Sequence, residues 1–546
     1  MKINISNEIK FNIMATILVI ILSITLTPIT FQNDTYYTIK VGESIVNNGI
    51  DMQDHLSWHE DLNYTYPHWL YDLMTYGVYS HFGFTGVYIL TCIFSAILAI
   101  TIYYTNSKIC KNNIISFFIT FITLFFIRAF IAARAQLVTF ILFVLTIYFI
   151  EKYLENKNKI YALGLILIPI IIANIHIAVF PFYFILYLPY IGEYIIAKLM
   201  FKLPFSNLKL KHLQKRLKKC EENKRNIKLE KKLKIKIEKS KKSIGNKTCR
   251  FKELKSNSFK IKIEENDNVK SLIIVMIISL FTGFLTPLGT NPYTYLVKTM
   301  MGNTTAHIKE HAAITLARFP EALIFIAIFI IILTFTKVKI KLSDLFLVGG
   351  LTILTIFSQR QFSMLALLGS FTISKLIFEL ISLNPKNQLR QSVNLLEGFL
   401  FVVVTILICI CILRNRIKEK FIDESSYPVL ACDFINQNID IKNSRFYNEY
   451  NYGSYMIFRN IPVFIDSRAD LYDPKFSHKE NDIFMDYINT DNLNTFCEET
   501  FEKYQITHII TQNGSSLNNE IRHLNSPIYS EIYKDDNFTI YEYIRN

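Results

Sequence analysis

Residues 34–69, DTYYTIKVGESIVNNGIDMQDHLSWHEDLNYTYPHW, are the stretch around which we expect the chain to fold. They lie between an apolar run at 11–29 and another at 84–104, each near the length that crosses a bilayer. A polar connection of this length is longer than two neighbouring spans need. It contains acids, three histidines and both tryptophans of the chain. These side chains suit a site for a polar, ring-shaped ligand; the alternative is a solvated loop with an aromatic interface anchor.

The composition of the whole chain is typical of a polytopic membrane protein. Hydrophobic residues make up 51% of the 546 residues, and charged residues only 19%. Several apolar runs approach the roughly 20 residues that a membrane helix needs. We expect about eleven spans, at 11–31, 84–104, 113–131, 136–153, 159–177, 178–200, 270–286, 320–336, 343–358, 361–382 and 396–414. The fold class expected is therefore an all-α polytopic membrane domain.

The net charge of +14 is concentrated in one segment. Residues 202–262 contain 23 Lys and Arg but only 5 Glu, so the rest of the chain is slightly acidic. The basic pI therefore gives no indication of nucleic-acid binding. We expect a cytoplasmic insertion at 202–269, either solvated or close to anionic lipid headgroups.

The distribution of Lys and Arg in the short connections predicts the orientation. Basic connections at 107–113, 151–159, 337–341 and 384–391 fall on the same side as the insertion, which is then cytoplasmic. This places residues 34–69, residues 287–319 and everything after Arg414 outside, although 414–420 is itself basic. We expect a multi-pass protein of the cell membrane, with membrane halves at 1–201 and 270–421.

The tail, residues 422–546, changes from apolar runs to soluble alternation. Pro428 can open a short helix through Ile435. We expect strands at 463–465, 507–511 and 538–544, and helices at 482–488 and 495–504. The tail is therefore predicted to be a small α/β extracytoplasmic domain.

Several common catalytic motifs are absent from the sequence. It contains no Walker A loop and no G-x-G-x-x-G or G-x-S-x-G motif, so ATP-driven transport and serine hydrolysis have no support. It also has no CxxC or HExxH motif that would indicate zinc.

Polar residues at the ends of expected spans are the next candidates. Arg134, His176 and Arg360 all fall on the expected outer side. Each alone could be a satisfied or snorkelling side chain. Their common side favours a site instead, and an Arg guanidinium suits a phosphate.

Short motifs recur along most of the chain in a characteristic order. They are Asp34-Thr-Tyr-Tyr with Gly42-Glu43, His68-Trp69-Leu70 with Asp72, Arg134-Ala-Gln136, Asn174-Ile-His176, Asn291-Pro292-Tyr293, Ile308-Lys309-Glu310-His311, Arg360, Tyr450-Asn-Tyr-Gly453-Ser-Tyr455 and Val463-Phe-Ile-Asp466-Ser-Arg468-Ala-Asp470-Leu-Tyr472. This set resembles the bacterial multispanning proteins related to GT-C glycosyltransferases. Ser454, Ser467, Ala135 and His311 depart from the family's pattern, and the basic insertion lies outside the resemblance.

The resemblance implies a GT-C-like fold and a reaction on the outer face. A sugar would pass from a polyprenyl-phosphate carrier to an envelope glycan, lipid or protein acceptor, in a single inverting displacement. Asp34 is our first choice for the general base or a metal ligand, because it lies just beyond the first span; Asp51 and Asp54 are the second choices. The residues expected to bind substrate or phosphate are Arg134, His176, Arg360, Trp69, Glu310, Asp466 and Arg468.

A divalent metal ion is a possible cofactor. Candidate ligands are Asp34, Asp54, His55 and His59, since positions four apart share a helix face. The alternative for the last three is a solvated amphipathic turn.

Two other functions remain open at this point. One is a transporter or flippase for a lipid-linked solute, which would need charges through the bilayer midplane. The other is a non-catalytic envelope protein whose tail binds a partner. Asp466 and Arg468 are expected to order the tail against the membrane site or an acceptor, or to form a local salt bridge.

Overall fold

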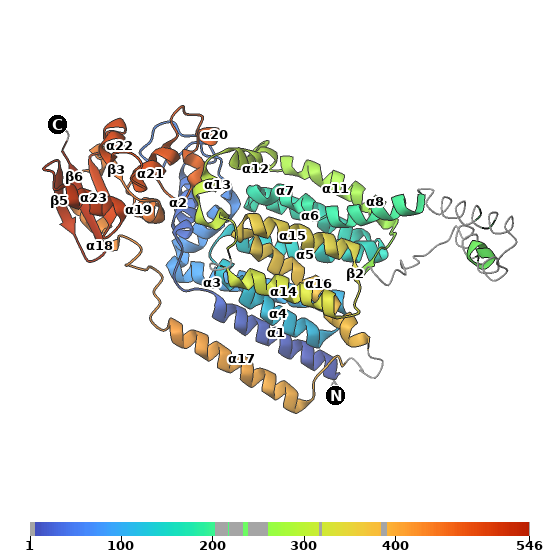
Figure 1. Ribbon diagram of the computed structural model, residues 1–546. Helices are drawn as coiled ribbons and strands as arrows, with labels where there is room; N and C mark the ends of the chain where they lie inside the picture. The colour runs from blue at the N-terminus through green and yellow to red at the C-terminus, as the bar shows by residue number, and fades with distance from the viewer. Residues whose placement is uncertain are drawn as a thin grey trace.

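The protein is mostly helical, with a small sheet near its C-terminus. The computed structural model describes residues 6–202, 214, 217, 233–238, 260–315, 319–383 and 390–544. A bundle of long, roughly aligned helices forms most of the molecule, and residues 422–544, called the C-terminal domain below, lie at one end of it (Figure 1). Most of the basic insertion lies outside the described residues.

Among the described residues, seven stretches of helix are long and apolar enough to cross a membrane. They are Asn7–Leu26 (α1), Trp69–Cys110 (α3), Asn113–Phe130 (α4, Asn113–Ile127, with the 3₁₀ turn η1, Arg128–Phe130), Ala135–Asn156 (α5), Ile177–Leu199 (η2, Ile177–Val179; α7, Phe180–Ile185; α8, Leu188–Lys202), Gln359–Ser382 (η5, Gln359–Gln361; α16, Phe362–Ser382) and Leu395–Arg416 (α17). Four shorter apolar stretches are Lys159–Ile175 (α6), Asn268–Phe284 (α11, Asn268–Leu280, with η3, Phe281–Phe284), Pro320–Phe335 (α14) and Leu342–Phe357 (α15). Every apolar stretch expected from the sequence overlaps one of these helices.

Short polar side chains begin several of these helices. The Ser6 hydroxyl accepts a hydrogen bond from the Ile9 amide, and the side chains of Asn112 and Asn158 act in the same way at α4 and α6. Such caps satisfy amide groups that have no partner within the helix. The polar connections between apolar runs therefore also define where the helices start.

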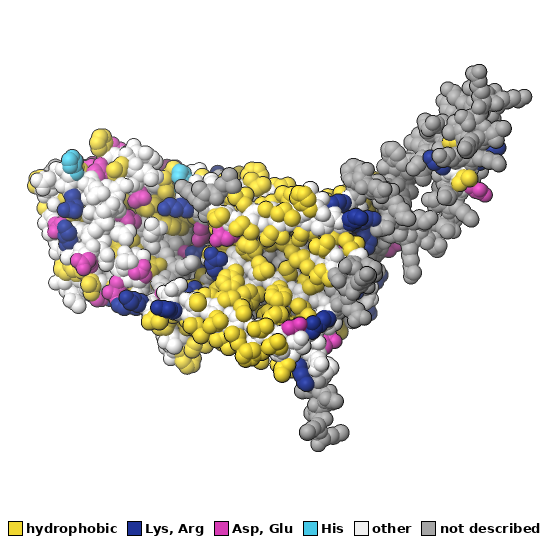
Figure 2. Space-filling model, turned by 60° about the horizontal axis from the view of Figure 1, so that its bottom comes forward, with side chains coloured by type: hydrophobic (Ala, Val, Ile, Leu, Met, Phe, Trp, Pro, Cys, Tyr) yellow, Lys and Arg dark blue, Asp and Glu magenta, His cyan; other side chains and the backbone are white. Residues whose placement is uncertain are grey.

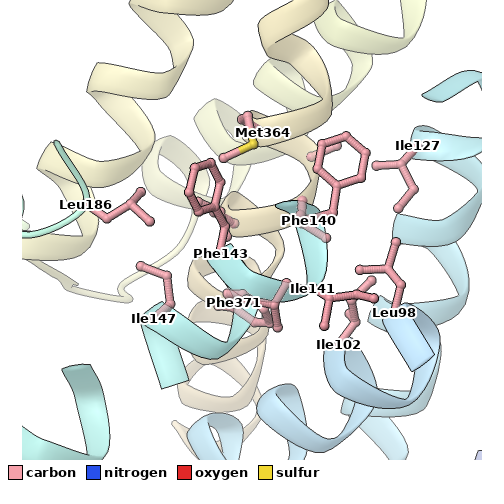
Figure 3. Close-up of a cluster of buried hydrophobic side chains, with 14 of the residues drawn as sticks. Leu98, Ile102, Ile127, Phe140, Ile141, Phe143, Ile147, Leu186, Met364 and Phe371 are labelled. Carbon is pink, nitrogen blue, oxygen red and sulfur yellow. The ribbon is translucent and has the colours of Figure 1, made fainter. Parts of the chain in front are cut away.

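The centre of the bundle is a dry hydrophobic core. Phe140, Phe143 and Ile147 of α5 pack among side chains of α3, α4 and α16, including Phe371 (Figure 3). All four are almost completely buried. Packing of this kind is the main source of stability for helices that meet without polar contacts.

The outer surface of the bundle is also apolar. Figure 2 shows a broad band of hydrophobic side chains, while charged groups gather on the C-terminal domain and at the far end of the band. In α17, Leu396, Phe399 and Leu407 are each more than half exposed. A soluble protein rarely exposes so large an apolar surface, so the bundle has the surface of a membrane protein.

The stretch at 34–69 is not a single loop as expected. Its first part is the amphipathic helix α2, Asn33–Asn48, which buries Tyr36, Tyr37 and Ile39; no helix occurs in 49–68. Helix α2 packs against α3 and against α19, Tyr450–Phe458. The sequence did not predict this helix, because only one of its faces is apolar and its other residues are polar.

The C-terminal domain contains a four-stranded sheet of order β3-β4-β6-β5. The strands are Phe446–Tyr447 (β3), His508–Gln512 (β4), Tyr529–Lys534 (β5) and Phe538–Tyr543 (β6), with β3 parallel to β4 and the other pairs antiparallel. Its helices are α18 (Val429–Asn438), α19, α20 (Pro474–Ser477), α21 (Ile483–Asp491), α22 (Cys497–Lys503) and α23 (Ser516–Leu524). The helices expected at 428–435, 482–488 and 495–504 and the strands at 507–511 and 538–544 are confirmed.

The strand expected at 463–465 is wrong. These residues are completely buried, but they make only one isolated bridge, between Ser57 and Val463. The Asn448 side chain accepts a hydrogen bond from the Phe464 amide and donates one to the Ile465 carbonyl. A buried amide side chain thus replaces a neighbouring strand, and burial alone cannot distinguish the two cases.

The described residues that flank the basic insertion on its two sides lie close together, at the end of the bundle away from the C-terminal domain. Lys198 near the end of α8 forms an ion pair with Glu265, which follows β1, Ile261–Lys262. Strand β1 pairs in parallel with β2, Ile340–Lys341. Lys260 donates to the Leu333 carbonyl in the last turn of α14 at 2.6 Å. The chain therefore leaves and re-enters the bundle at one place.

Candidate functional site

A small polar cavity lies at the end of the bundle next to the C-terminal domain. Its volume is about 30 Å³, enough for about two water molecules. The lining residues come from α2, the start of α3, α5 and the turns after α6 and α15: Asp34, Tyr37, Thr38, His68, Tyr71, Arg134, Ala135, Gln136, His176 and Arg360. Four sequence-predicted site residues, Asp34, Arg134, His176 and Arg360, are thus brought together.

Arg134 is the central charge of the cavity. It precedes α5, and its guanidinium lies 2.9 Å from an Asp34 oxygen and 3.2 Å from a Glu310 oxygen. Burial opposes its charge, but Asp34 and Glu310 more than offset this and raise the pKa of Arg134 above its usual value. The Nε of Arg134 is buried without a hydrogen-bond partner. The guanidinium is therefore only partly satisfied by the protein.

Arg360 is a second guanidinium, and it forms no ion pair with any described residue. It lies in η5 and is half-buried. No carboxylate of the described residues lies within 4.0 Å of it, and no hydrogen bond from its side chain occurs within the same residues. A half-buried cation without a partner is costly, which favours an anionic ligand at this position.

Two neutral histidines lie beside the guanidinium groups. The rings of His68 and His176 are 4.8 Å apart, and His176 Nδ1 lies 2.9 Å from the Thr139 hydroxyl. Burial, together with Arg360, lowers the pKa of His68 to about 3; burial and His68 place the pKa of His176 well below its usual value. Both rings can therefore accept or donate a hydrogen bond without adding charge.

The segment 302–314 brings Glu310, which does not itself line the cavity, to Arg134 and is held from two sides. It follows α12, Asn291–Met301, and includes α13, Thr304–His307, and η4, Lys309–His311. On one side, the C-terminal domain accepts hydrogen bonds from it: Asp473 from the Asn303 amide at 2.8 Å, and Asp470 from the Thr304 hydroxyl at 3.1 Å. On the other side, the Gln359 amide donates to the Ala312 carbonyl at 2.9 Å. Glu310 is thus positioned by both the domain and the Arg360 turn.

Asp54, Asp466 and Arg468 form a separate, closed group. Arg468 lies 2.6 Å from Asp54 and 2.7 Å from Asp466, and the three side chains are at most 2% exposed. Tyr472 donates to Asp466, and the Ser57 amide donates to Asp54. Burial raises the pKa of Asp54, but Arg468 more than offsets it and the pKa is lowered. None of these three residues lines the cavity.

The candidate metal ligands are not brought together. Asp34 lines the cavity, Asp54 is held by Arg468, and His55 pairs with Asp51 at 2.7 Å. His59 donates to the Phe464 carbonyl, and burial lowers the pKa of His59 to about 4. The expected helix-face spacing is wrong because 49–68 contains no helix. Within the described ranges, no group of three His, Cys, Asp or Glu side chains could hold a metal ion.

The sequence did not single out the other six lining residues as site residues: Tyr37, Thr38, His68, Tyr71, Ala135 and Gln136. Asp34, Tyr37 and Thr38 are spaced three and four residues apart on α2, which places them on one helix face. His68, just before α3, completes this wall. The spacing of three and four residues from Asp34 could have indicated that Tyr37 and Thr38 share its side of a helix. That inference requires residues 33–48 to be recognised as a helix first. Trp69 is half-buried and does not line the cavity.

A second charged group lies at the opposite end of the bundle. Lys375 of α16 lies 2.9 Å from Glu151 of α5 and 2.8 Å from Asp344 of α15. From the sequence, we expected polar groups beside the apolar runs only at the end of the bundle that holds the cavity. Helix α5 therefore carries a charge at each end, Arg134 and Glu151, with the hydrophobic core of Figure 3 between them.

Comparisons with known proteins identify no family. No protein-family model matches the chain, and no curated protein matches it. What the cavity can do must therefore be argued from its own chemistry.

Proposed function

We propose that this protein is a membrane glycosyltransferase of the GT-C type, with about eleven spans. In this proposal the cavity and the C-terminal domain face the outside of the cell. The protein transfers a sugar from a polyprenyl-phosphate carrier to an envelope acceptor. The observation that carries the proposal is the unpaired Arg360 guanidinium, in the same cavity as Arg134. Two guanidiniums at the end of an apolar bundle suit a lipid phosphate.

The other lining residues support the same chemistry. Neutral His68 and His176 can bind a phosphate oxygen or a sugar hydroxyl without a change of charge. The cavity is smaller than a sugar, so a ligand must displace part of the wall. Glu310 is the group to displace, because its side chain is 48% exposed and it lies on the segment 302–314. A phosphate would take over its place beside Arg134.

Transport of a lipid-linked solute is less well supported. The charged groups at the two ends of α5 could mark a path, as a transporter needs. Phe140, Phe143 and Phe371 fill the space between them and are almost completely buried. A non-catalytic envelope protein is the remaining alternative, and it does not explain why Arg360 is left without a partner.

Binding of a polyprenyl phosphate to the purified protein in detergent tests the proposal. Arg360→Ala should weaken binding about 10- to 100-fold, the equivalent of a hydrogen bond to a charged group. The matched control is Arg128→Ala, since Arg128 is already paired with Glu321 at 3.3 Å and does not line the cavity. Equal effects of the two substitutions would contradict the role of Arg360. Sugar transfer from polyprenyl-phosphate sugars then separates an enzyme from a binding protein.

A further inference from the structure

Asp72, in the first turn of α3, is a buried carboxyl group that forms no ion pair within the described part of the chain. Its side chain is completely buried, and among the described residues neither carboxylate oxygen accepts a hydrogen bond of ordinary geometry. A buried carboxylate in this state costs several kcal/mol unless water or a proton satisfies it. Such a group needs an explanation in terms of structure or function.

Asp72 lies directly behind the wall of the cavity. Helix α2 approaches α3 closely because Gly42 has no side chain: a Cβ there would lie 2.2 Å from the Asp72 carbonyl oxygen. This approach places Thr38, one turn earlier on α2, next to the Asp72 carboxyl group. Thr38 also lines the cavity. The Thr38 hydroxyl is therefore the link between the cavity and Asp72.

No cation neutralises Asp72. The titratable groups that face it are Tyr37 of α2, Tyr64 of the 49–68 stretch, Tyr71 of α3 itself and Arg468 of the C-terminal domain. Arg468 is committed to its two closer carboxylates. The Tyr64 hydroxyl is buried and has no partner either. Asp72 and Tyr64 are thus two buried polar side chains whose oxygen atoms have no hydrogen-bond partner of ordinary geometry among the described residues.

The other acidic candidates all have partners. Asp34 pairs with Arg134, Asp51 with His55 and Asp54 with Arg468. Each of these three carboxyl groups is thus already in contact with a cationic or imidazole side chain. Asp72 would gain, because protonation removes an unpaired charge from a buried position. Among these four carboxyl groups, it is the one for which proton uptake is favourable.

We propose that Asp72 is the proton acceptor of the site and receives the proton through the Thr38 hydroxyl. This inference rests on the proposed function. The acceptor oxygen forms a bond to the anomeric carbon while the bond from that carbon to the carrier phosphate oxygen breaks. The phosphate leaves with the electron pair, beside Arg134 and Arg360. The proton of the acceptor passes to Thr38, whose own proton passes to Asp72.

Infrared spectroscopy of the full-length protein tests the inference without substrate. The parent protein should show a carboxylic-acid carbonyl band that titrates, and Asp72→Asn should remove it. Asp34→Asn is the control and should keep the band, because it removes a carboxyl group of the cavity wall but leaves Asp72 in place. Failure of Asp72→Asn to change the titrating bands would overturn the inference whether or not sugar transfer is observed.

Turnover gives the second measurement. Asp72→Asn should lower the rate by about 10²–10⁴ while binding of the carrier phosphate persists. Turnover of the parent should rise with pH through the midpoint of the infrared titration. Thr38→Val should lower turnover and keep the band, whereas Thr38→Ser should restore turnover. Normal turnover by Asp72→Asn would overturn the inference. A titrating Asp72 in a protein that transfers no sugar from any carrier would instead overturn the proposed function.

Discussion

Two groups of the same composition, an arginine between two acids, have opposite surroundings in this protein. Asp54–Arg468–Asp466 is closed: its side chains are at most 2% exposed, and further donors fill its oxygens. In Asp34–Arg134–Glu310 the side chains are 24%, 21% and 48% exposed, and an unpaired Arg360 lies in the same cavity. In the closed group, all charged atoms have partners within the protein; in the open group, some do not. This difference in partners, more than residue type, distinguishes a structural ion group from a candidate site.

The closed group should show the largest effect on stability. Arg468→Ala would leave two buried carboxylates without their cation, and should lower the free energy of unfolding by about 3–5 kcal/mol. Thermal unfolding of the full-length protein in detergent measures this. Arg445→Ala is the control, since that Arg is 38% exposed and its only carboxylate, Glu60, is 3.9 Å away. Similar stability of the two variants would remove the distinction between the groups.

The open group should show its effect on function. Asp34→Asn keeps the size of the side chain but weakens the hold on Arg134, so turnover should fall about 10- to 100-fold, the equivalent of a charged hydrogen bond. The melting temperature should hardly change, because the pair is partly exposed. A sugar-transfer assay with a parallel melting curve provides both values. A large loss of stability would place this group with the closed one.

The closed group also predicts a dependence on pH through its neighbour His59. The pKa of His59 is about 4 when folded and 6.5 as the ordinary value, so the unfolded chain takes up a proton first as the pH falls. Stability should therefore be complete above pH 6.5 and decrease from there towards pH 4, by up to about 1.4 kcal/mol per pH unit. His59→Gln should reduce the change of the melting temperature with pH between pH 6.5 and pH 4. His55→Gln is the control, because His55 is exposed.

The smallest effect is expected for Glu310. Glu310→Gln removes the carboxylate that competes with a phosphate for Arg134, so a polyprenyl phosphate should bind up to about fivefold more tightly, as expected from a partly exposed ion pair. Glu321→Gln, at the paired Arg128, should leave the affinity unchanged. Weaker binding by Glu310→Gln would mean that Glu310 contacts the ligand itself.

Much of the helical framework could be predicted because burial in a membrane leaves long apolar runs in the sequence. Helix α2 could not, since polar residues such as Lys40 and Glu43 alternate with its apolar residues in the sequence and leave no long apolar run. The 463–465 segment was predicted as a strand because it is apolar, and only the distant Asn448 side chain explains its real conformation.

The candidate site was predicted in part for the same physical reason. Arg134, His176 and Arg360 stand out as polar residues beside apolar runs. Asp34 and Asp54 do not stand out in this way, because both are acidic residues of the same polar stretch, 34–69. Their different environments arise from Arg134 and Arg468, which lie far along the chain, so only the tertiary structure separates them.

The ion pair between Lys198 and Glu265 has a consequence for how this chain tolerates change in length. Because the chain leaves and re-enters the bundle at one point, the bundle's packing does not depend on how many residues lie between. For flexible loops in general, doubling the length costs only about 0.6 kcal/mol in closure entropy. Replacement of residues 203–259 by a short Gly/Ser linker should therefore leave the protein folded. A change in the length of this segment should leave the fold of the bundle and the cavity at its other end unaltered.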